Sequence, residues 1–397
     1  MIPTLRRATA ADLPAIATAD SRAFGVHYTD ADLDGIRAQL DPARFLLALD
    51  GERVVGVAGS FPFTVTLPGG GALPVEGVTW VSVAPTHRRR GVLRALMAEQ
   101  HRDFVAGGLA VSMLTASEGG IYGRFGYGPA TVSRGVEIDR RFAVFRADVP
   151  DPGGVRFVDA DEARALAPGV QRRWCAVTPG ALSRDDLWWD GLLRDPEHRR
   201  GGRTALFHLM HPDGYASYRI DHSDASCHVV DLFAATGEAH LALWRVLLGL
   251  DLARTVRAPR ACPPGDPLPF LLTDPRQVRT TGLRDGTWAR VLDVAAVLAA
   301  RRYTVEVDVV LEVRDTFLDR GGRFRLRGGP DGAECTPAVG APAVHVDVTA
   351  LGSLLLGGHR ASTLGRAHLL RTGDPALLRR LDAAFTADRD PVHGTEF

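Results

Sequence analysis

The stretch with the clearest chemical potential is a run of arginines between a strand-like segment and a helical one. Val81-Ser82-Val83 alternates as a strand does, Pro85 ends it, and Arg88-Arg89-Arg90-Gly91 opens a segment with helical periodicity. A helix start offers unpaired backbone N–H groups and the positive end of the helix dipole. Gly91 lets the backbone approach an anion, and arginines add charge-assisted hydrogen bonds to its oxygens. The pattern predicts a pyrophosphate-binding loop, with a solvated arginine-rich helix start as the alternative.

A second stretch, Thr115 to Ala130, combines glycines with closely spaced aromatic residues. Taken alone, the spacing of Ile121, Tyr122, Phe125 and Tyr127 is typical of an apolar helical cluster in a protein core. The two tyrosines are also candidate proton donors, since a phenol has a pKa near 10. The residues alone favour the core interpretation.

These stretches need a framework, and the first 140 residues supply alternating strand and helix signals. We expect strands at about 4–7, 44–49, 54–67, 73–83, 111–115 and 131–138, and helices at about 10–23, 30–40, 88–105 and 121–127. The strand at 131–138 is expected to close this first block. The Pro/Gly-rich segment 148–154 then reads as a linker.

Two further blocks follow the linker. Strands at 205–210, 215–220 and 227–232 and a helix at 239–250 repeat part of the first block's order. The turn at 235–240 carries a glutamate instead of arginines, so this block is expected to bind no cofactor. In the last block, strands at 305–313, 323–326 and 343–348 are expected in an antiparallel sheet, with helices at 349–356 and 375–386. Its apolar run 351–356 could line a cavity or pack in a core.

Length and composition bound the possible functions. A chain of 397 residues, 45% hydrophobic and 24% charged, predicts two or three globular domains rather than a disordered protein. The 47 basic residues, all arginine, balance 47 acidic ones, so nothing favours a nucleic-acid partner. No apolar run is long enough for a membrane span, and we expect a cytoplasmic protein. The four cysteines form no CxxC pair, so no metal is expected.

The arginine loop resembles the acetyl-CoA loop of the GNAT superfamily of N-acetyltransferases. Arg88 and Gly91 match its Gln/Arg-x-x-Gly-x-Gly/Ala pattern. Leu93 departs from it, because it occupies the position of the final small residue. The stretch Thr115–Ala130 is similar to the Eis family of actinobacterial acetyltransferases, as are stretches at 209–215, 268–274, 358–364 and 378–385. The resemblance covers the whole chain. It implies an α/β (α+β) fold of two tandem GNAT-like mixed-sheet domains, the second degenerate, then a sterol-carrier-protein-like α+β domain. The expected limits are 1–145, 150–290 and 291–397.

The resemblance also assigns roles. It implies acetyl-CoA contacts, an oxyanion-type contact from the backbone N–H of Val83, and Tyr122 as the proton donor for the leaving thiolate. The implied cofactor-binding residues are Val81, Ser82, Val83, Arg89, Arg90, Gly91, Val92, Leu93, Arg94, Ser117 and Glu118. The assembly implied is a homohexamer.

The predicted reaction is direct acetyl transfer in a ternary complex, because the site stretches contain no cysteine acyl carrier. The resemblance points to aminoglycoside, polyamine-like or lysine amines as acceptors and to the C-terminal carboxylate of Phe397 as proton acceptor. Glu76 and Glu118 are internal alternatives to that base, whereas His27 and His87 are expected on the surface. Tentative acceptor contacts are Phe24 and Glu396, with Asp20 and Asp30 as further acidic candidates. The alternative function is a lipid-binding protein that acts through the C-terminal domain.

Overall fold

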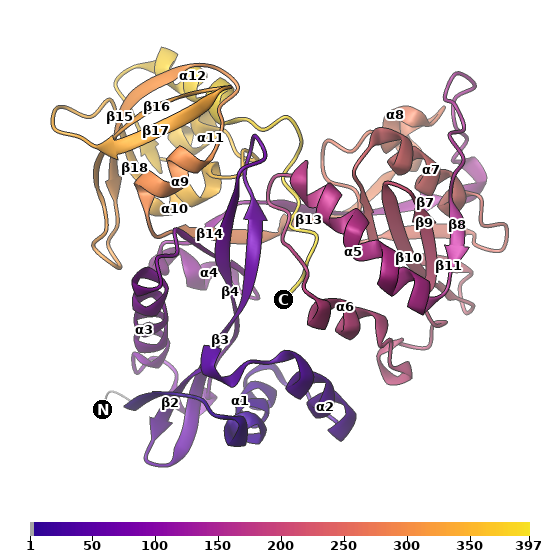
Figure 1. The fold of residues 1–397 in the computed structure, drawn as a ribbon, viewed down its shortest axis with the longest axis horizontal. Helices are drawn as coiled ribbons and strands as arrows, with labels where there is room; N and C mark the ends of the chain where they lie inside the picture. The colour runs from indigo at the N-terminus through magenta and orange to yellow at the C-terminus, as the bar shows by residue number, and fades with distance from the viewer. Residues whose placement is uncertain (1–3) are drawn as a thin grey trace.

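The computed structural model describes residues 4–397, which form three units packed around a common centre (Figure 1). The first unit is a seven-stranded sheet in the order β1-β2-β3-β4-β5-β14-β6, antiparallel except for the pair β4–β5. Its strands are β1 (Thr4–Arg7), β2 (Leu46–Asp50), β3 (Arg53–Thr66), β4 (Ala72–Val83), β5 (Val111–Thr115), β6 (Gly128–Pro129) and β14 (Thr287–Val291). Its helices are α1 (Leu13–Phe24), α2 (Asp30–Gln39), α3 (Val92–Ala106) and α4 (Gly119–Tyr122).

The predicted helix at 88–105 begins later than the sequence suggested. Arg89 has φ of 62° and Gly91 has φ of 82°, and neither conformation fits a right-handed helix. Helix α3 therefore starts at Val92, and the arginines before it form an exposed loop. The predicted helix at 121–127 is likewise shorter, because Gly126 has φ of 84° and ends the helical turn.

The predicted strand at 131–138 does not close the first sheet. Strand β7 (Val132–Asp139) pairs with β12 (Thr255–Ala258) and β13 (Arg279–Asp285) of the second sheet. Its place in the first sheet is taken by β14, whose Trp288 is opposite Leu114 of β5. The two sheets thus exchange strands from segments about 150 residues apart, and the first sheet is incomplete without a segment from beyond the linker.

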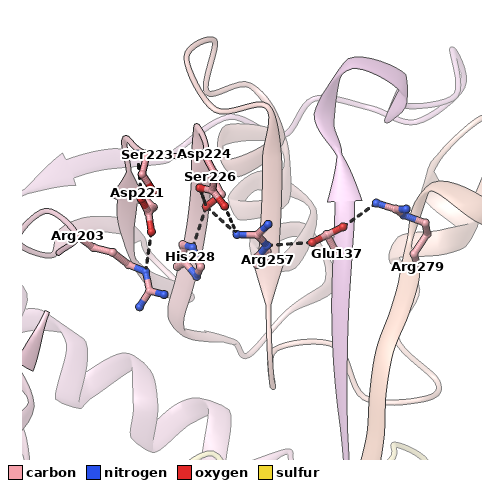
Figure 2. A network of polar contacts seen from close by, with 9 residues as sticks. All are labelled: Glu137, Arg203, Asp221, Ser223, Asp224, Ser226, His228, Arg257 and Arg279. Atoms are coloured by element: carbon pink, nitrogen blue, oxygen red, sulfur yellow. Dashed lines mark hydrogen bonds and ion pairs between the residues drawn. The ribbon is translucent and has the colours of Figure 1, made fainter. Parts of the chain in front are cut away.

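A polar network holds the exchanged strand in the second sheet (Figure 2). Glu137 on β7 accepts hydrogen bonds from Arg257 on β12, at 2.9 Å, and from Arg279 on β13, at 2.7 Å. Arg257 also binds Asp224 at 2.6 Å, and Asp224 lies beside Asp221 and His228 in a group with metal-ligand spacing. Arg203 pairs with Asp221 and Arg257 pairs with Asp224, so each of these carboxylates has a guanidinium partner.

The second unit is a sheet in the order β13-β7-β12-β11-β10-β9-β8. Its remaining elements are β8 (Arg156–Val158), β9 (Phe207–His211), β10 (Gly214–Asp221), β11 (Ser226–Ala234), α5 (Ala160–Ala176), α6 (Asp186–Leu193), α7 (Gly237–Leu248) and α8 (Leu268–Leu271). The side chain of Thr236 caps the start of α7 by accepting from the N–H of Ala239, and Glu238 lies in the first turn. Helix α7, which corresponds to α3 of the first unit, therefore begins with a capped, acidic end that does not suit an anion.

The third unit has a five-stranded sheet in the order β17-β16-β15-β18-β19. Its elements are β15 (Val307–Arg314), β16 (Gly322–Gly329), β17 (Gly332–Pro337), β18 (Val344–Asp347), β19 (Leu370–Arg371), α9 (Val294–Ala300), α10 (Val348–Leu354), α11 (Ala361–Arg366) and α12 (Pro375–Phe385). The expectation of an antiparallel sheet is wrong for one pair, since β15 and β18 run parallel.

One continuous core joins the third unit to the first. Helix α10 packs on β14 and β6, and the largest apolar cluster includes side chains from both sheets. Arg290 on β14 is fully buried and pairs with Asp315 of the third unit at 2.5 Å. The leucines of the run 351–356 are at most 3% exposed and belong to this cluster, so the run packs rather than lining a cavity.

Candidate active site

The candidate site begins where β4 and β5 separate. Their parallel pairing runs from Val75 opposite Val111 to Val78 opposite Leu114, and among residues 4–397 it extends no further. Strand β4 continues to Val83, and at Trp80 it takes a left-handed conformation with φ of 52°. The pairing of β4 with β3 shifts at the same point, which is a β-bulge. The bulge turns the end of β4 away from β5 and opens a gap at the edge of the sheet.

A cavity of about 630 Å³ lies in this gap. The end of β4, the arginine loop, the start of α3 and the α4 segment surround it. Of the predicted cofactor contacts it is lined by Val81, Ser82, Val83, Arg89, Gly91, Val92, Leu93, Arg94, Ser117 and Glu118, together with Tyr122 and Phe24. Arg90 is exposed and is not among the lining residues. The structure thus brings together the two stretches that the sequence analysis singled out separately.

Two features of the cavity suit a phosphate-bearing thioester. Helix α3 has no side chain that caps its N-terminus, so its first N–H groups remain available to an anion beside Arg88 and Arg89. The hydroxyl of Ser82 is buried without a hydrogen-bond partner among the described residues. A buried hydroxyl normally has a partner, and a bound ligand with amide or carbonyl groups can supply one.

Tyr122 lies in the wall of this cavity and is only 6% exposed. Burial, with a smaller contribution from the charge of Glu118, raises the pKa of its phenol to about 12. The raised pKa keeps the hydroxyl protonated throughout the physiological range. Tyr122 can therefore donate a hydrogen bond to an anion that forms in the cavity.

Tyr127 has a different environment. Its hydroxyl lies 2.8 Å from Oγ of Ser112 and 2.9 Å from Nε2 of His101, and all three side chains are buried. His101 Nδ1 lies 2.6 Å from the carbonyl oxygen of Met97, which requires a proton on Nδ1. Nε2 is then the acceptor, and the Tyr127 hydroxyl donates to it. This closed network gives Tyr127 a structural role.

The C-terminal segment returns to the centre of the molecule, between the first two units (Figure 1). The N–H of Val392 donates to the carbonyl of Pro179 at 2.9 Å, and that of Leu182 donates to the carbonyl of His393 at 3.0 Å. Arg184 donates to the hydroxyl of Thr395 at 3.1 Å. These bonds run along the segment, so its last residues have a defined position.

Phe397 ends beside the gap in the first sheet. The hydroxyl of Thr115, the last residue of β5, donates to the carbonyl oxygen of Phe397 at 3.1 Å. The phenyl ring packs against Phe63, with ring centroids 5.0 Å apart. A Cβ atom at Gly77 of β4 would lie 2.7 Å from this ring, so the close approach requires glycine. Gly77 is a supporting residue that the sequence analysis missed, and no motif marks it.

The other candidate carboxylates lie elsewhere. Glu76 faces away from Phe397, because neighbouring strand residues point to opposite faces, and it pairs with Arg44. Glu396 pairs with Arg260 of the second unit. Asp20 is buried and accepts a hydrogen bond from the hydroxyl of Tyr28 at 2.6 Å, and burial raises its pKa. None of these three lines the main cavity, and neither does the exposed Asp30.

Two smaller corrections complete the site. His87 was expected on the surface, but it lines the cavity and lies 3.1 Å from Asp50, whereas His27 is exposed as expected. Arg124 also lines the cavity and escaped the sequence analysis, because it lies outside the arginine loop. Among residues 4–397, no helix has the length and apolar character needed to cross a bilayer.

Comparisons with known proteins identify the family of the chain. Residues 4–130 and 180–291 each match the model of an acetyltransferase (GNAT) domain, and residues 294–394 match a sterol carrier protein domain. The N-acetyltransferase Eis of Mycobacterium tuberculosis is 49% identical over 346 residues, 85% of this chain and 84% of that protein. The crystal structure of Eis1 from Mycobacterium abscessus superposes with a TM-score of 0.90 at 36% identity, covering 99% of this chain and 100% of that one. An N-acetyltransferase of Streptomyces coelicolor is 36% identical over 86% of each chain.

Proposed function

The chain belongs to the Eis family of GNAT N-acetyltransferases, and we propose that it transfers the acetyl group of acetyl-CoA directly to a primary amine in the gap between β4 and β5. Two GNAT domains followed by a sterol-carrier-type domain confirm the predicted fold class, and the family confirms the predicted acyltransferase class. We further propose that this chain has the amine acceptors, the residue roles and the homohexameric assembly that the resemblance implies. The observation that carries it is the single cavity in which the arginine loop, the uncapped start of α3 and Tyr122 meet.

The proposal assigns cofactor binding to the arginine loop and the strand edge. Arg88 and Arg89, with the free N–H groups of α3, would bind the pyrophosphate, and the hydroxyl of Ser82 would bind the pantetheine arm. Acetyl-CoA supplies an activated acyl group whose carbonyl oxygen gains negative charge when an amine attacks. A backbone N–H at Val83, which pairs with β3 but lies beyond the last pair between β4 and β5, would stabilise that charge.

The amine must lose a proton before it attacks. An alkylamine with a pKa near 10.4 is neutral in about one molecule in 2,000 at pH 7, so removal of the proton at the site raises the reactive fraction. We assign this step to the terminal carboxylate of Phe397. Thr115 and Gly77 are positioning residues in this scheme, because the first binds the terminal carbonyl oxygen and the second makes room for the ring.

The leaving thiolate must be stabilised as the C–S bond breaks. The Tyr122 phenol, with a pKa of about 12, is a weaker acid than a thiol of pKa near 8.5. Complete proton transfer would therefore be uphill by about 5 kcal/mol. Tyr122 acts in this scheme by donating a hydrogen bond to the developing thiolate, while the thiol's final protonation state is set by solvent.

Three variants of the C-terminus and one of Gly77, on β4, test the assignment of the base. Deletion of Phe397 withdraws the carboxylate by about 3.5 Å, beyond hydrogen-bond reach, and a C-terminal extension converts it to a neutral amide. Both should abolish turnover while acetyl-CoA binding persists. Phe397→Leu keeps the carboxylate and should retain more activity than either, and Gly77→Ala, which displaces the ring, should lower kcat. Full activity in the extended protein would contradict the assignment.

A further inference from the structure

We propose that Phe317 of the third unit is a positioning residue for acetyl-CoA, because its ring holds the guanidinium of Arg94 at the main cavity, ready to bind a phosphate. The inference rests on the proposed function and extends the cofactor site into the sterol-carrier-type domain. Three observations carry it: the position of the Arg94 side chain, the contacts that hold the Phe317 ring, and the buried ion pair behind that ring.

Arg94 lies in the first turn of α3 and lines the main cavity. It is exposed, and within residues 4–397 it forms no ion pair. Its guanidinium carbon lies over the ring of Phe317, 5.3 Å from the ring centroid. A guanidinium is planar, so it can stack on an aromatic face while its N–H groups point outward in its own plane. The contact with Phe317 therefore leaves Arg94 with hydrogen-bond donors for a phosphate.

The ring of Phe317 is held by the wall of the same cavity. It meets Phe125 and His101 edge to face, with centroids 5.1 Å and 5.9 Å away. Phe125 lines the cavity, and Phe317 packs against the aromatic cluster that contains Tyr122. Edge-to-face contacts are directional, so they restrain the orientation of the ring. The ring that Arg94 lies over therefore has a defined place beside the cavity.

A buried ion pair anchors the turn that carries Phe317. Asp315 accepts hydrogen bonds from the backbone N–H groups of Phe317 and Leu318, at 3.1 Å and 3.2 Å, through one carboxylate oxygen. Its other oxygen binds Arg290 of β14, the strand that completes the first sheet. Both members of this pair are buried, and a charge-assisted hydrogen bond adds geometric specificity as well as energy. The turn 315–318 is thus tied to the same sheet that forms the cavity.

This arrangement prepares the arginine for its ligand. An exposed arginine loses side-chain freedom when it binds a phosphate. Where the guanidinium is already held beside the cavity, less of that freedom remains to be lost, and the affinity rises. A cation–π contact near solvent corresponds to about a two- to fivefold change in a binding constant. Phe317 should therefore affect the affinity for acetyl-CoA and not the chemical step.

The test measures the dissociation constant of acetyl-CoA by isothermal titration, together with kcat and the melting temperature. Phe317→Leu should raise the dissociation constant about two- to fivefold and leave kcat within about twofold. Phe317→Tyr keeps an aromatic face and should restore the affinity. Phe324→Leu is the matched control, because Phe324 is also half-buried in the third unit but packs against the largest apolar cluster and does not line the cavity. It should leave the affinity unaltered.

A double-mutant cycle separates an effect that acts through Arg94 from a general effect on the fold. Arg94→Ala should itself weaken acetyl-CoA binding, and Phe317→Leu should add little in that background. Equal losses from Phe317→Leu with and without Arg94 would overturn the inference, as would unchanged affinity in Arg94→Ala, a change at an exposed residue that should not prevent folding. In either case, acetyl-CoA binding and amine-dependent thiol release by the unaltered protein would leave the proposed function standing. Absence of both in the unaltered protein would overturn the inference and the proposed function together.

Discussion

Replacement of the two neighbouring tyrosines by phenylalanine should produce opposite effects on activity and stability. Within residues 4–397, the Tyr122 hydroxyl makes no hydrogen bond, so Tyr122→Phe leaves no buried group unpaired and should barely change the melting temperature. It removes the donor for the leaving thiolate. A positioned acid contributes about 10²-fold or more, so kcat should fall by about 10²-fold, which corresponds to about 2.7 kcal/mol in the barrier.

Tyr127→Phe removes a hydroxyl that is bonded on both sides. His101 Nε2, now 2.9 Å from that hydroxyl, would remain buried without a donor, and Ser112 would lose its partner. Leaving a buried polar group unpaired costs about 1–3 kcal/mol in folding stability. At roughly 2–4 °C per kcal/mol for a domain of this size, the melting temperature should fall by several degrees. The kcat of the folded variant should change little.

The assay combines initial rates of CoA release at saturating substrates with thermal unfolding followed by circular dichroism. Each variant serves as the control for the other, because both lose one phenolic oxygen from the same aromatic cluster. A larger loss of kcat in Tyr127→Phe than in Tyr122→Phe, with both proteins folded, would refute the assignment of the proton donor.

Three further predictions follow from the cavity and the fold. Arg89→Ala should raise the KM for acetyl-CoA by removing a phosphate contact. Gly91→Glu should raise it more strongly, because it places a carboxylate beside the same phosphates. Unchanged cofactor affinity in both variants would exclude the loop as the phosphate-binding site. Isothermal titration should find one acetyl-CoA per chain, since α7 begins with a capped and acidic turn. Burial lowers the pKa of His101 and His393 to about 4, so the unfolded chain binds more protons below pH 6.5; the melting temperature should fall between about pH 6.5 and pH 4.

Local signals in the sequence predicted most elements of the first unit. Alternating apolar residues located β4, and the periodicity of α3 was correct beyond Gly91. The error at 88–91 arose because arginines favour helices, whereas the left-handed conformations of Arg89 and Gly91 are set by the loop. The same loop was predicted to bind an anion because of its arginines, its glycine and the helix start that follows it.

The exchange of β7 and β14 could not be read from local patterns. Each strand has the alternation of a sheet strand, but alternation does not specify a partner, and β14 pairs with a strand more than 170 residues earlier. The position of Phe397 depends on contacts of the same long range, with Thr115 and Gly77. A fragment of residues 1–145 would lack β14, so it should fail to fold as a stable domain.

The most direct test of direct acetyl transfer is a two-substrate kinetic experiment. Initial rates of CoA release are measured while acetyl-CoA and a primary amine are both varied, and the acetylated amine is identified by mass spectrometry. The account predicts amine-dependent release, a product that carries one acetyl group, and double-reciprocal lines that intersect, as expected for a ternary complex. Parallel lines, or release of CoA before amine is added, would indicate an acyl-enzyme and contradict direct transfer.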